Sequence, residues 1–277
     1  MKSRRNRAVA AALVTAALSG AAIAGATASS SVAGTNPGLM SANTLVVGMT
    51  LQFKPEMYLK GTTPAGYDVD ILHLLAKKLG VTLKIDNLGF TGLIPGLQAK
   101  KFDMVSVGLS NTPARAQVVS FSNPYVPYAQ ILAVPAKDAA SITSTAQLNK
   151  PGDTITALLS STAQTEAKTV FPKAKITALA DQNSDFNLVA TGRANGIVVE
   201  DYLLAQYSKV NPGKLAEAKI KPLDVQYGSY AVQHGNTTLV KYLNTFLCTE
   251  QDNGTLAKLY KKDFGTPSFP GLPACKA

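Results

Sequence analysis

The chain has 277 residues, of which 46% are hydrophobic, and it carries a formal net charge of +10 at pH 7. This length suffices for one large domain or for two lobes with cores of their own. No basic run exceeds a pair of residues and none alternates with aromatic residues, which indicates a solvated basic surface and argues against nucleic-acid binding. The two cysteines are too few and too far from either histidine for a zinc site, so we expect no metal and no cofactor.

The N-terminal segment has the pattern of a secretory signal. An uncharged run over 8–28 follows four cations, Lys2, Arg4, Arg5 and Arg7. Small residues lie at signal-peptidase spacing in Ala22-Ile23-Ala24 and Ala26-Thr27-Ala28. A membrane anchor is the alternative, but the run is rich in Ala, Gly and Thr and is weakly apolar for a spanning helix. We therefore predict a cleaved signal peptide over 1–28 and a mature protein in the periplasm.

Two further features refine the expected export route. The arginine pair at 4–5 is not followed by the Phe-Leu of a twin-arginine signal, and no cysteine lies near the cleavage site. We therefore expect the ordinary secretory route and no lipid anchor. Residues 29–43 are mostly Ser, Gly, Ala and Asn, which predicts a flexible leader.

The first half of the mature chain alternates between strand and helix patterns. The spacing of apolar residues predicts a strand over 45–49, a helix over 70–79, a strand over 81–85, a helix over 91–100 and a strand over 104–107. Such alternation is typical of a parallel sheet with helices on its faces.

The same alternation returns in the second half, after a break. The pattern predicts strands over 154–159, 175–179 and 196–199, helices over 162–170 and 184–191, a strand over 227–232, and closing helices over 237–247 and 255–261. Two α/β units therefore follow one another, and the second is inserted into the first.

This order predicts two lobes joined by two crossovers, near 133–135 and 221–227, with a cleft between them. We expect one lobe from 44–134 with 226–266 and the other from 135–225. If the lobes close on a ligand, 133–135 and 226–228 are the expected hinges.

The two cysteines, Cys248 and Cys275, predict one disulfide, because an even count in an exported chain favours pairing. The bridge would tie the tail, 267–277, to the last helices.

The most informative segment for function is Gly108-Leu109-Ser110-Asn111-Thr112-Pro113-Ala114-Arg115. Thr112 suits a helix N-cap and Pro113 the first helical position, which puts Arg115 in the first turn. Free N–H groups there favour an anion, and a guanidinium adds a bidentate carboxylate receptor. An arginine that reaches solvent or pairs with a structural acid fits this spacing equally well.

The second lobe offers groups that face this receptor. Ser161 and Gln164 fit a capping box, and the hydroxyls of Ser161 and Thr162 could reach a bound carboxylate. A buried strand ends at Glu200 and Asp201, where a ligand ammonium would lie in an open α/β sheet. One of these acids can cap the next helix while the other binds.

Phe53 and Phe90 each follow a predicted strand. Core packing is the commoner role of phenylalanine. Alternatively, the two rings grip a ligand side chain.

Several motifs, in the right order, resemble one protein family. The run Gly66-Tyr67-Asp68-Val69-Asp70-Ile71 is similar to the signature of the polar-amino-acid family of bacterial extracellular solute-binding proteins. Further similar segments are Gly92-Leu93-Ile94-Pro95 to Phe102-Asp103, Thr112-Pro113-Ala114-Arg115, Phe121-Ser122-Asn123-Pro124-Tyr125, and Asp252-Asn253-Gly254-Thr255 to Phe264-Gly265. The resemblance covers about 45–265, nearly the whole mature chain.

The resemblance implies a type II periplasmic-binding-protein fold, a Venus flytrap that closes on one amino acid. It implies that Arg115, with Ser110 and Thr162, holds the α-carboxylate. Glu200 and the carbonyl of Gly108 would hold the α-ammonium, and Phe53 and Phe90 would sandwich the side chain.

Three positions depart from the family pattern. Glu200 is often Asp, Ser160 is usually Gly, and the acid after the first strand is here Thr50. Because Thr50 carries no charge, we expect polar uncharged or acidic ligands to bind better than cationic ones. The alternative is that Glu56, or an acid brought in by closure, supplies the missing charge.

The resemblance suggests a monomer that delivers an amino acid to the membrane permease of an ABC importer. A dehydratase of the cyclohexadienyl or prephenate type on the same scaffold is a competing function, since Glu200 could act as an acid in the cleft. A periplasmic sensor is a third.

Overall fold

The centre of the fold is one nine-stranded sheet. The computed structural model describes residues 36–265 and 269–276, so the predicted signal peptide lies outside the described residues. The strand order is β5-β1-β6-β12-β7-β10-β8-β9, with β11 paired to β7. The strands are β1 (Thr44–Met49), β5 (Thr82–Asn87), β6 (Met104–Ser110), β7 (Val119–Pro135), β8 (Thr154–Leu158), β9 (Lys175–Leu179), β10 (Gly196–Glu200), β11 (Leu215–Glu217) and β12 (Asp224–Gln233).

Helices connect the parallel strands, as the alternating pattern predicted. Parallel pairing joins β1 to β5 and β6, and β8 to β9 and β10. No helix in the described part of the chain is long and apolar enough to cross a membrane. The helices are α1 (Tyr67–Leu79), α2 (Leu93–Gln98), α3 (Pro113–Ala116), α4 (Thr162–Val170), α5 (Gln182–Ala190), α6 (Asp201–Val210), α7 (Thr237–Asp252) and α8 (Thr255–Phe264), with short 3-10 helices η1 (Phe90–Gly92) and η2 (Thr145–Leu148).

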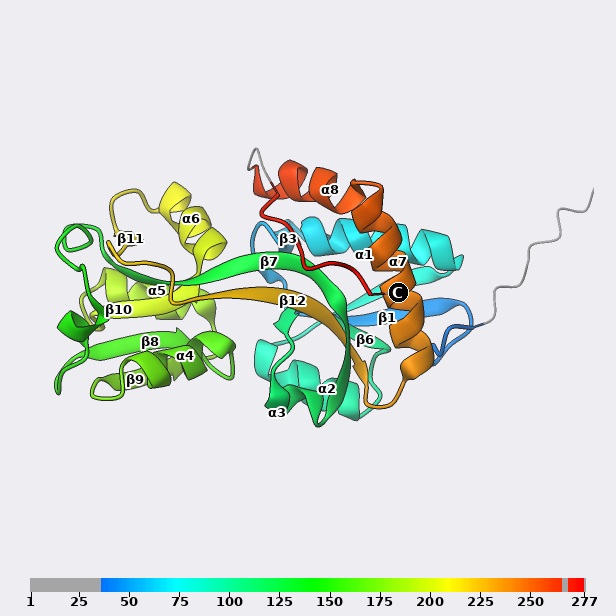
Figure 1. The fold of residues 1–277 in the computed structure, drawn as a ribbon, viewed down its shortest axis with the longest axis horizontal. Coiled ribbons are helices and arrows are strands. Elements are labelled where there is room, and N and C mark those ends of the chain that lie inside the picture. The colour runs from blue at the N-terminus through cyan, green and yellow to red at the C-terminus, as the bar shows by residue number, and fades with distance from the viewer. Residues whose placement is uncertain (1–35, 266–268, 277) are drawn as a thin grey trace, which may run out of the picture. The chain divides into compact units, whose positions relative to one another are not determined.

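The two halves of the sheet define two lobes. We call β1 to β6 with α1, α2, α3, α7 and α8 the first lobe, and β8 to β11 with α4, α5 and α6 the second lobe. Figure 1 shows β7 and β12 running side by side from one lobe to the other. These two strands are the crossovers.

The two predicted crossovers are long paired strands, which join the two α/β units into one sheet. β12 pairs with β7 from Asp224↔Gln130 to Gln233↔Val119, and beyond Gln130 β7 pairs with β10. The expected hinge at 133–135 therefore lies inside the second lobe, paired with β10 and β11. Prolines at 124, 127 and 135 hid β7 from the sequence pattern, because proline cannot donate to a ladder.

A small second sheet was also missed. It contains β2 (Gln52–Phe53), β3 (Met57–Lys60) and β4 (Thr63–Ala65). Its chain crosses the start of α1, where the N–H of Asp68 donates to the carbonyl of Glu56 at 3.0 Å. Gly66 has φ 114°, and a Cβ there would lie 2.5 Å from the same carbonyl, so only glycine fits. This contact fixes Glu56 against the first turn of α1.

Local signals predicted most other elements, with some differences. The helices over 162–170 and 70–79 are present, and the strand over 175–179 has the predicted bounds. The helix expected over 91–100 is broken into η1 and α2, and β6 continues past Gly108 to Ser110. The part of the expected flexible leader that is described is anchored, since Leu39 is buried and the N–H of Met40 donates to Asp103 at 2.6 Å.

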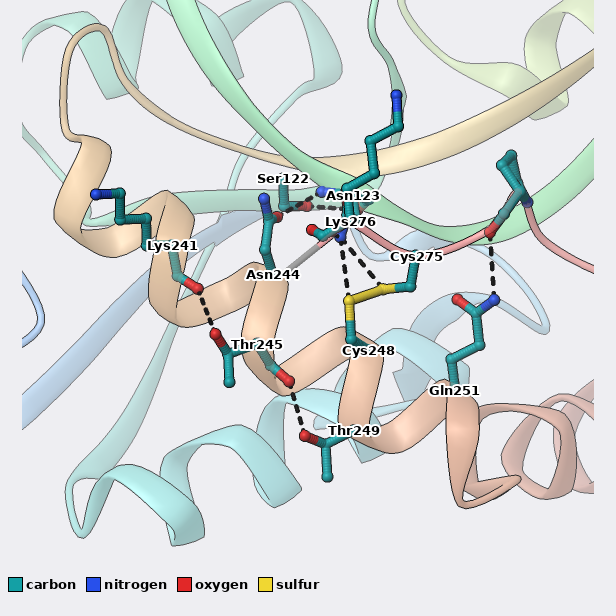
Figure 2. The surroundings of a disulfide bond; sticks show 11 residues. Ser122, Asn123, Lys241, Asn244, Thr245, Cys248, Thr249, Gln251, Cys275 and Lys276 are labelled. Carbon is teal, nitrogen blue, oxygen red and sulfur yellow. Dashed lines mark hydrogen bonds between the residues drawn. A yellow bond between two sulfur atoms is a disulfide. The ribbon is translucent and has the colours of Figure 1, made fainter.

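The predicted disulfide between Cys248 and Cys275 is present, with the Cα atoms 5.4 Å apart. Figure 2 shows that it fastens the tail to α7 beside Asn123 of β7. The Asn123 side chain donates to the carbonyl of Lys276 at 2.6 Å, and its backbone N–H donates to Asn244 at 2.7 Å. The bridge therefore joins the tail, α7 and a crossover strand.

Candidate functional site

A cavity with an empty volume of about 380 Å³ lies between the lobes. The first lobe and β7 line it with Phe53, Glu56, Phe90, Val107, Gly108, Leu109, Ser110, Arg115 and Tyr128. The second lobe lines it with Leu158, Ser161, Thr162, Glu200 and Tyr202. The structure therefore brings together every residue that the sequence proposed for the site, except Thr50.

Arg115 reaches across the cavity from α3. Its Nη1 donates to the carbonyl of Ser110 and its Nη2 to the carbonyl of Ser160 in the second lobe, each at 3.1 Å. The guanidinium also lies 5.9 Å from the centre of the Phe90 ring, within cation–π range. Burial lowers the pKa of Arg115, but a guanidinium stays charged in proteins. The Arg115 guanidinium therefore donates hydrogen bonds to both lobes.

The helix that carries Arg115 is a single turn. The Oγ1 of Thr112 accepts from the N–H of Arg115 at 3.3 Å, which confirms the predicted cap. With only four residues, α3 has little macrodipole, so the anion-binding character comes from the guanidinium and not from the helix.

Ser110, Gly108 and Tyr128 form the floor of the cavity. The Tyr128 hydroxyl lies 3.0 Å from the carbonyl oxygen of Gly108 and 2.5 Å from Ser110 Oγ. Gly108 has φ 56°, and a Cβ there would lie 2.4 Å from Glu56 Oε1, so the position requires glycine. The Gly108 carbonyl keeps a second lone pair for a ligand ammonium.

Glu56 stands beside this floor, and Asp68 lies behind it. The two residues are 1% and 0% exposed. Asp68 Oδ2 accepts from Ser106 at 2.6 Å and from the Tyr125 hydroxyl at 2.5 Å. The Tyr125 hydroxyl in turn accepts from the N–H of Gly108 at 2.9 Å, so Asp68 positions the floor through Tyr125.

Serine and threonine at the start of α4 form part of the second-lobe wall. Ser161 Oγ accepts from the N–H of Gln164 at 3.1 Å and donates to the carbonyl of Leu158 at 2.7 Å. Gln164 reaches the N–H of Ser160, one residue before the position that a capping box requires. The hydroxyl of Ser161 is thus engaged in capping, whereas Thr162 Oγ1 donates to Gln226 on β12 at 2.8 Å.

Glu200 ends β10 and lines the cavity from the second lobe. It accepts from the buried Gln130 side chain at 2.9 Å, and burial raises its pKa. Asp201 does not line the cavity and accepts from the N–H of Tyr202 at 2.9 Å. Of the two acids, Glu200 is the one in the cavity wall.

Two of the predicted ligand contacts differ from the arrangement in the structure. Phe53 and Phe90 meet edge to face at 6.3 Å with a 60° angle, so they form a corner and not a parallel sandwich. Thr50 is buried and accepts from Gln52 at 3.0 Å, outside the cavity wall.

Sequence reasoning did not assign three polar wall residues to the site, Glu56, Tyr128 and Tyr202. The Tyr202 hydroxyl donates to Glu56 Oε2 and so links the second lobe to the first. Glu56 was named only as an alternative acid, because its position depends on the missed β2–β4 sheet. Tyr128 lies in the missed strand β7, and no local signal marked it. Among the described residues no group of histidines, cysteines and acids could hold a metal ion.

Comparison with known proteins agrees with this fold and cavity. The chain is 29% identical over 242 residues to the arginine-binding extracellular protein ArtP of Bacillus subtilis, covering 85% of this chain and 90% of that protein. It is 26% identical over 227 residues to ABC transporter arginine-binding protein 1 of Escherichia coli, covering 80% and 91%.

Solved structures show the same architecture. The ancestral amino acid-binding protein AncCDT-1, described as a precursor of cyclohexadienyl dehydratase, matches with TM-score 0.74 and 33% identity, covering 80% of this chain and 96% of that one. An ancestral arginine-binding protein bound to glutamine matches with TM-score 0.74 and 30% identity, covering 81% and 99%.

The fold and the interlobe cavity define a type II periplasmic binding protein, as the resemblance implied. Residues 45–266 match the bacterial extracellular solute-binding proteins, family 3, and the chain belongs to this family. Membership implies a place outside the cytoplasm.

Proposed function

We propose that this protein binds one amino acid between its lobes and delivers it to the permease of an ABC importer. The observation that carries the proposal is that Arg115 and Glu200 line one cavity from opposite lobes. A carboxylate on Arg115 and an ammonium near Glu200 and the Gly108 carbonyl match an α-amino-acid head group. Both relatives are named as arginine-binding proteins, and one of them as belonging to an ABC transporter, which supports this proposal.

The charges of the wall bear on the side chain of the ligand. Our expectation of an uncharged or acidic ligand rested on the uncharged Thr50 and on a Glu200 already engaged by the α-ammonium, with Glu56 as the alternative acid. Glu56 also lines the cavity, and Arg115 is the one cation among the described lining residues. A second ligand carboxylate would find no cationic partner, whereas two acids against one cation give the wall an acidic balance that favours a second ligand cation. We therefore propose the order cationic, then uncharged, then acidic.

Competition calorimetry on ligand-stripped protein tests both points, with L-arginine, L-glutamine and L-glutamate as the probes. We expect L-arginine to bind at least about tenfold tighter than L-glutamate. Tighter binding of L-glutamate would reverse the proposed order. The absence of binding by all three, and by the other common amino acids in a thermal-shift screen, would reject the function.

An enzyme on the same scaffold is the second candidate. Buried acids with raised pKa values in a cavity favour it, as does the likeness to AncCDT-1. We propose binding without catalysis. Mass spectrometry of an amino acid or prephenate released after incubation separates the two, because unchanged molecules support binding and a converted product supports an enzyme.

The remaining proposals concern the chain as a whole. We propose a monomer in the periplasm, exported by the signal peptide over 1–28 and free of lipid. The intact mass of the exported protein tests this: retention of Met1 or an attached lipid would contradict it.

A further inference from the structure

Glu56 and Asp68 leave one oxygen each without a hydrogen-bond donor. Glu56 Oε1 and Asp68 Oδ1 are buried and lack a partner among the described residues. Their other oxygens are satisfied, Glu56 Oε2 by Tyr202 and Asp68 Oδ2 by Ser106 and Tyr125. A proton held between the two carboxyls satisfies both orphaned oxygens at once.

The surroundings of the pair favour this shared proton. Burial is the largest cause that raises the pKa of both acids, and the charge of Asp68 raises the pKa of Glu56 further. The hydrogen bond between them raises the pKa of Glu56 and lowers that of Asp68, which puts the proton on Glu56. The pair therefore keeps a proton on Glu56 near neutral pH, and any negative charge of the pair is on Asp68.

Among the described residues, no cation is a cause of the pKa shifts of Glu56 and Asp68. The other acid that faces it is Glu200, whose charge raises the pKa of Glu56. The remaining titratable neighbours are tyrosines with raised pKa values, which stay neutral: Tyr67, Tyr125, Tyr128, Tyr202, Tyr230 and Tyr260. The charge of Arg115 acts to lower the pKa values of Glu200 and Tyr128 instead. The charge of the pair is thus available to a cation from outside.

Of the two acids, Glu56 is the one that lines the cavity. Its Oε1 lies so close to Gly108 that no Cβ fits between them. We propose that Glu56 is a further ligand-binding residue, which takes an ammonium group of the ligand while the proton shared with Asp68 leaves to solvent. This inference rests on the proposed function and adds a second acid to its ammonium subsite.

The sign of the pH dependence follows from the proton balance. A bound ammonium stabilises the doubly ionised pair and lowers its pKa values, so binding releases up to one proton. Affinity should therefore rise with pH while the free pair still holds its proton, and level off above that range.

Two measurements test the proposal. Infrared spectroscopy of the ligand-free protein at pH 7 should show a protonated-carboxyl band that Glu56→Gln removes. Calorimetry with L-arginine, in buffers of different ionisation enthalpy, should show proton release in the wild type and almost none in Glu56→Gln. The variant keeps the size of the side chain and can donate to Asp68, and its affinity should fall about tenfold at pH 8 and less at pH 5.5.

Asp252→Asn is the matched control, because Asp252 is exposed at the end of α7 and lies outside the cavity wall. It should keep both the band and the proton release. A missing band in the wild type, or proton release that persists in Glu56→Gln, would overturn the inference. If no amino acid binds to the wild type, the proposed function fails together with the ammonium contact, and the infrared band then reports on the acid pair alone.

Discussion

The two walls of the cavity are built differently. The first-lobe wall rests on a buried network, in which Asp68 holds Tyr125, Tyr125 holds Gly108, and Glu56 is fixed by the start of α1. The second-lobe wall consists of the start of α4 and the end of β10. Ser161 is engaged in capping there, and Glu200 is held by Gln130 of β7.

This difference suggests a division of labour. A wall with a rigid network is preorganised, so it can recognise a head group without first being ordered. The second-lobe wall has few polar groups without a hydrogen-bond partner. Its contacts with the first-lobe wall depend on closure of the two lobes. We therefore expect the largest loss of affinity from removal of Arg115 in the first-lobe wall, and smaller losses from changes in the second-lobe wall.

Arg115→Ala should have the largest effect. Removal of one partner of a buried charged pair costs on the order of 3–5 kcal/mol, which is at least about a hundredfold in affinity. Calorimetry with L-arginine measures the loss, and circular dichroism checks that the fold is kept. Arg193→Ala, at an exposed arginine bonded to Thr191, is the control and should bind normally. A loss below tenfold in Arg115→Ala would contradict the assignment.

Glu200→Gln should have the next largest effect. A hydrogen bond to a charged group contributes about 1.5–3 kcal/mol, so affinity should fall about tenfold to a hundredfold. Asp201→Asn is the natural comparison, because this acid is adjacent but outside the cavity wall. If Asp201→Asn lost more affinity than Glu200→Gln, the ammonium would have been assigned to the wrong acid.

Gln226→Leu should act on closure. The Gln226 Oε1 accepts from Ser110 Oγ of the first lobe and from Thr162 Oγ1 of the second, each at 2.8 Å. Loss of this shared acceptor should weaken the closed form by about 1 kcal/mol, a few-fold in affinity, seen mainly as faster dissociation in stopped-flow experiments. Gln233→Leu, on the same strand outside the cavity, should dissociate at the wild-type rate. Equal rates for the two variants would exclude this role.

Removal of the disulfide should leave affinity unchanged. Cys248 and Cys275 are 27 residues apart and do not line the cavity. Cys248→Ser with Cys275→Ser should lower the free energy of unfolding by about 3–4 kcal/mol through the unfolded chain. Urea denaturation measures the stability and calorimetry the affinity. A large loss of affinity in the folded variant would mean that the tail contributes to the site.

The sequence predicted residues of the cavity wall where local signals were strong. The cap at Thr112 located Arg115, and the end of a buried strand located Glu200. Glu56 was not assigned, because its position depends on a backbone contact with Gly66 and on a sheet of very short strands. Thr50 was assigned by resemblance alone, and its hydroxyl is occupied by Gln52. Long-range pairing, as in β7 and β12, leaves little local pattern when prolines interrupt the strand.

The central claim is that the protein binds both charges of one amino-acid head group. Arg115 binds the carboxylate, and Glu200 and Glu56, with the Gly108 carbonyl, bind the ammonium. Calorimetry with L-arginine, L-arginine amide and Nα-acetyl-L-arginine tests it directly, since each derivative removes one charge. We predict that L-arginine binds at least about a hundredfold tighter than either derivative, because each leaves a buried charge unpaired. Binding of either derivative within tenfold of L-arginine would contradict the account.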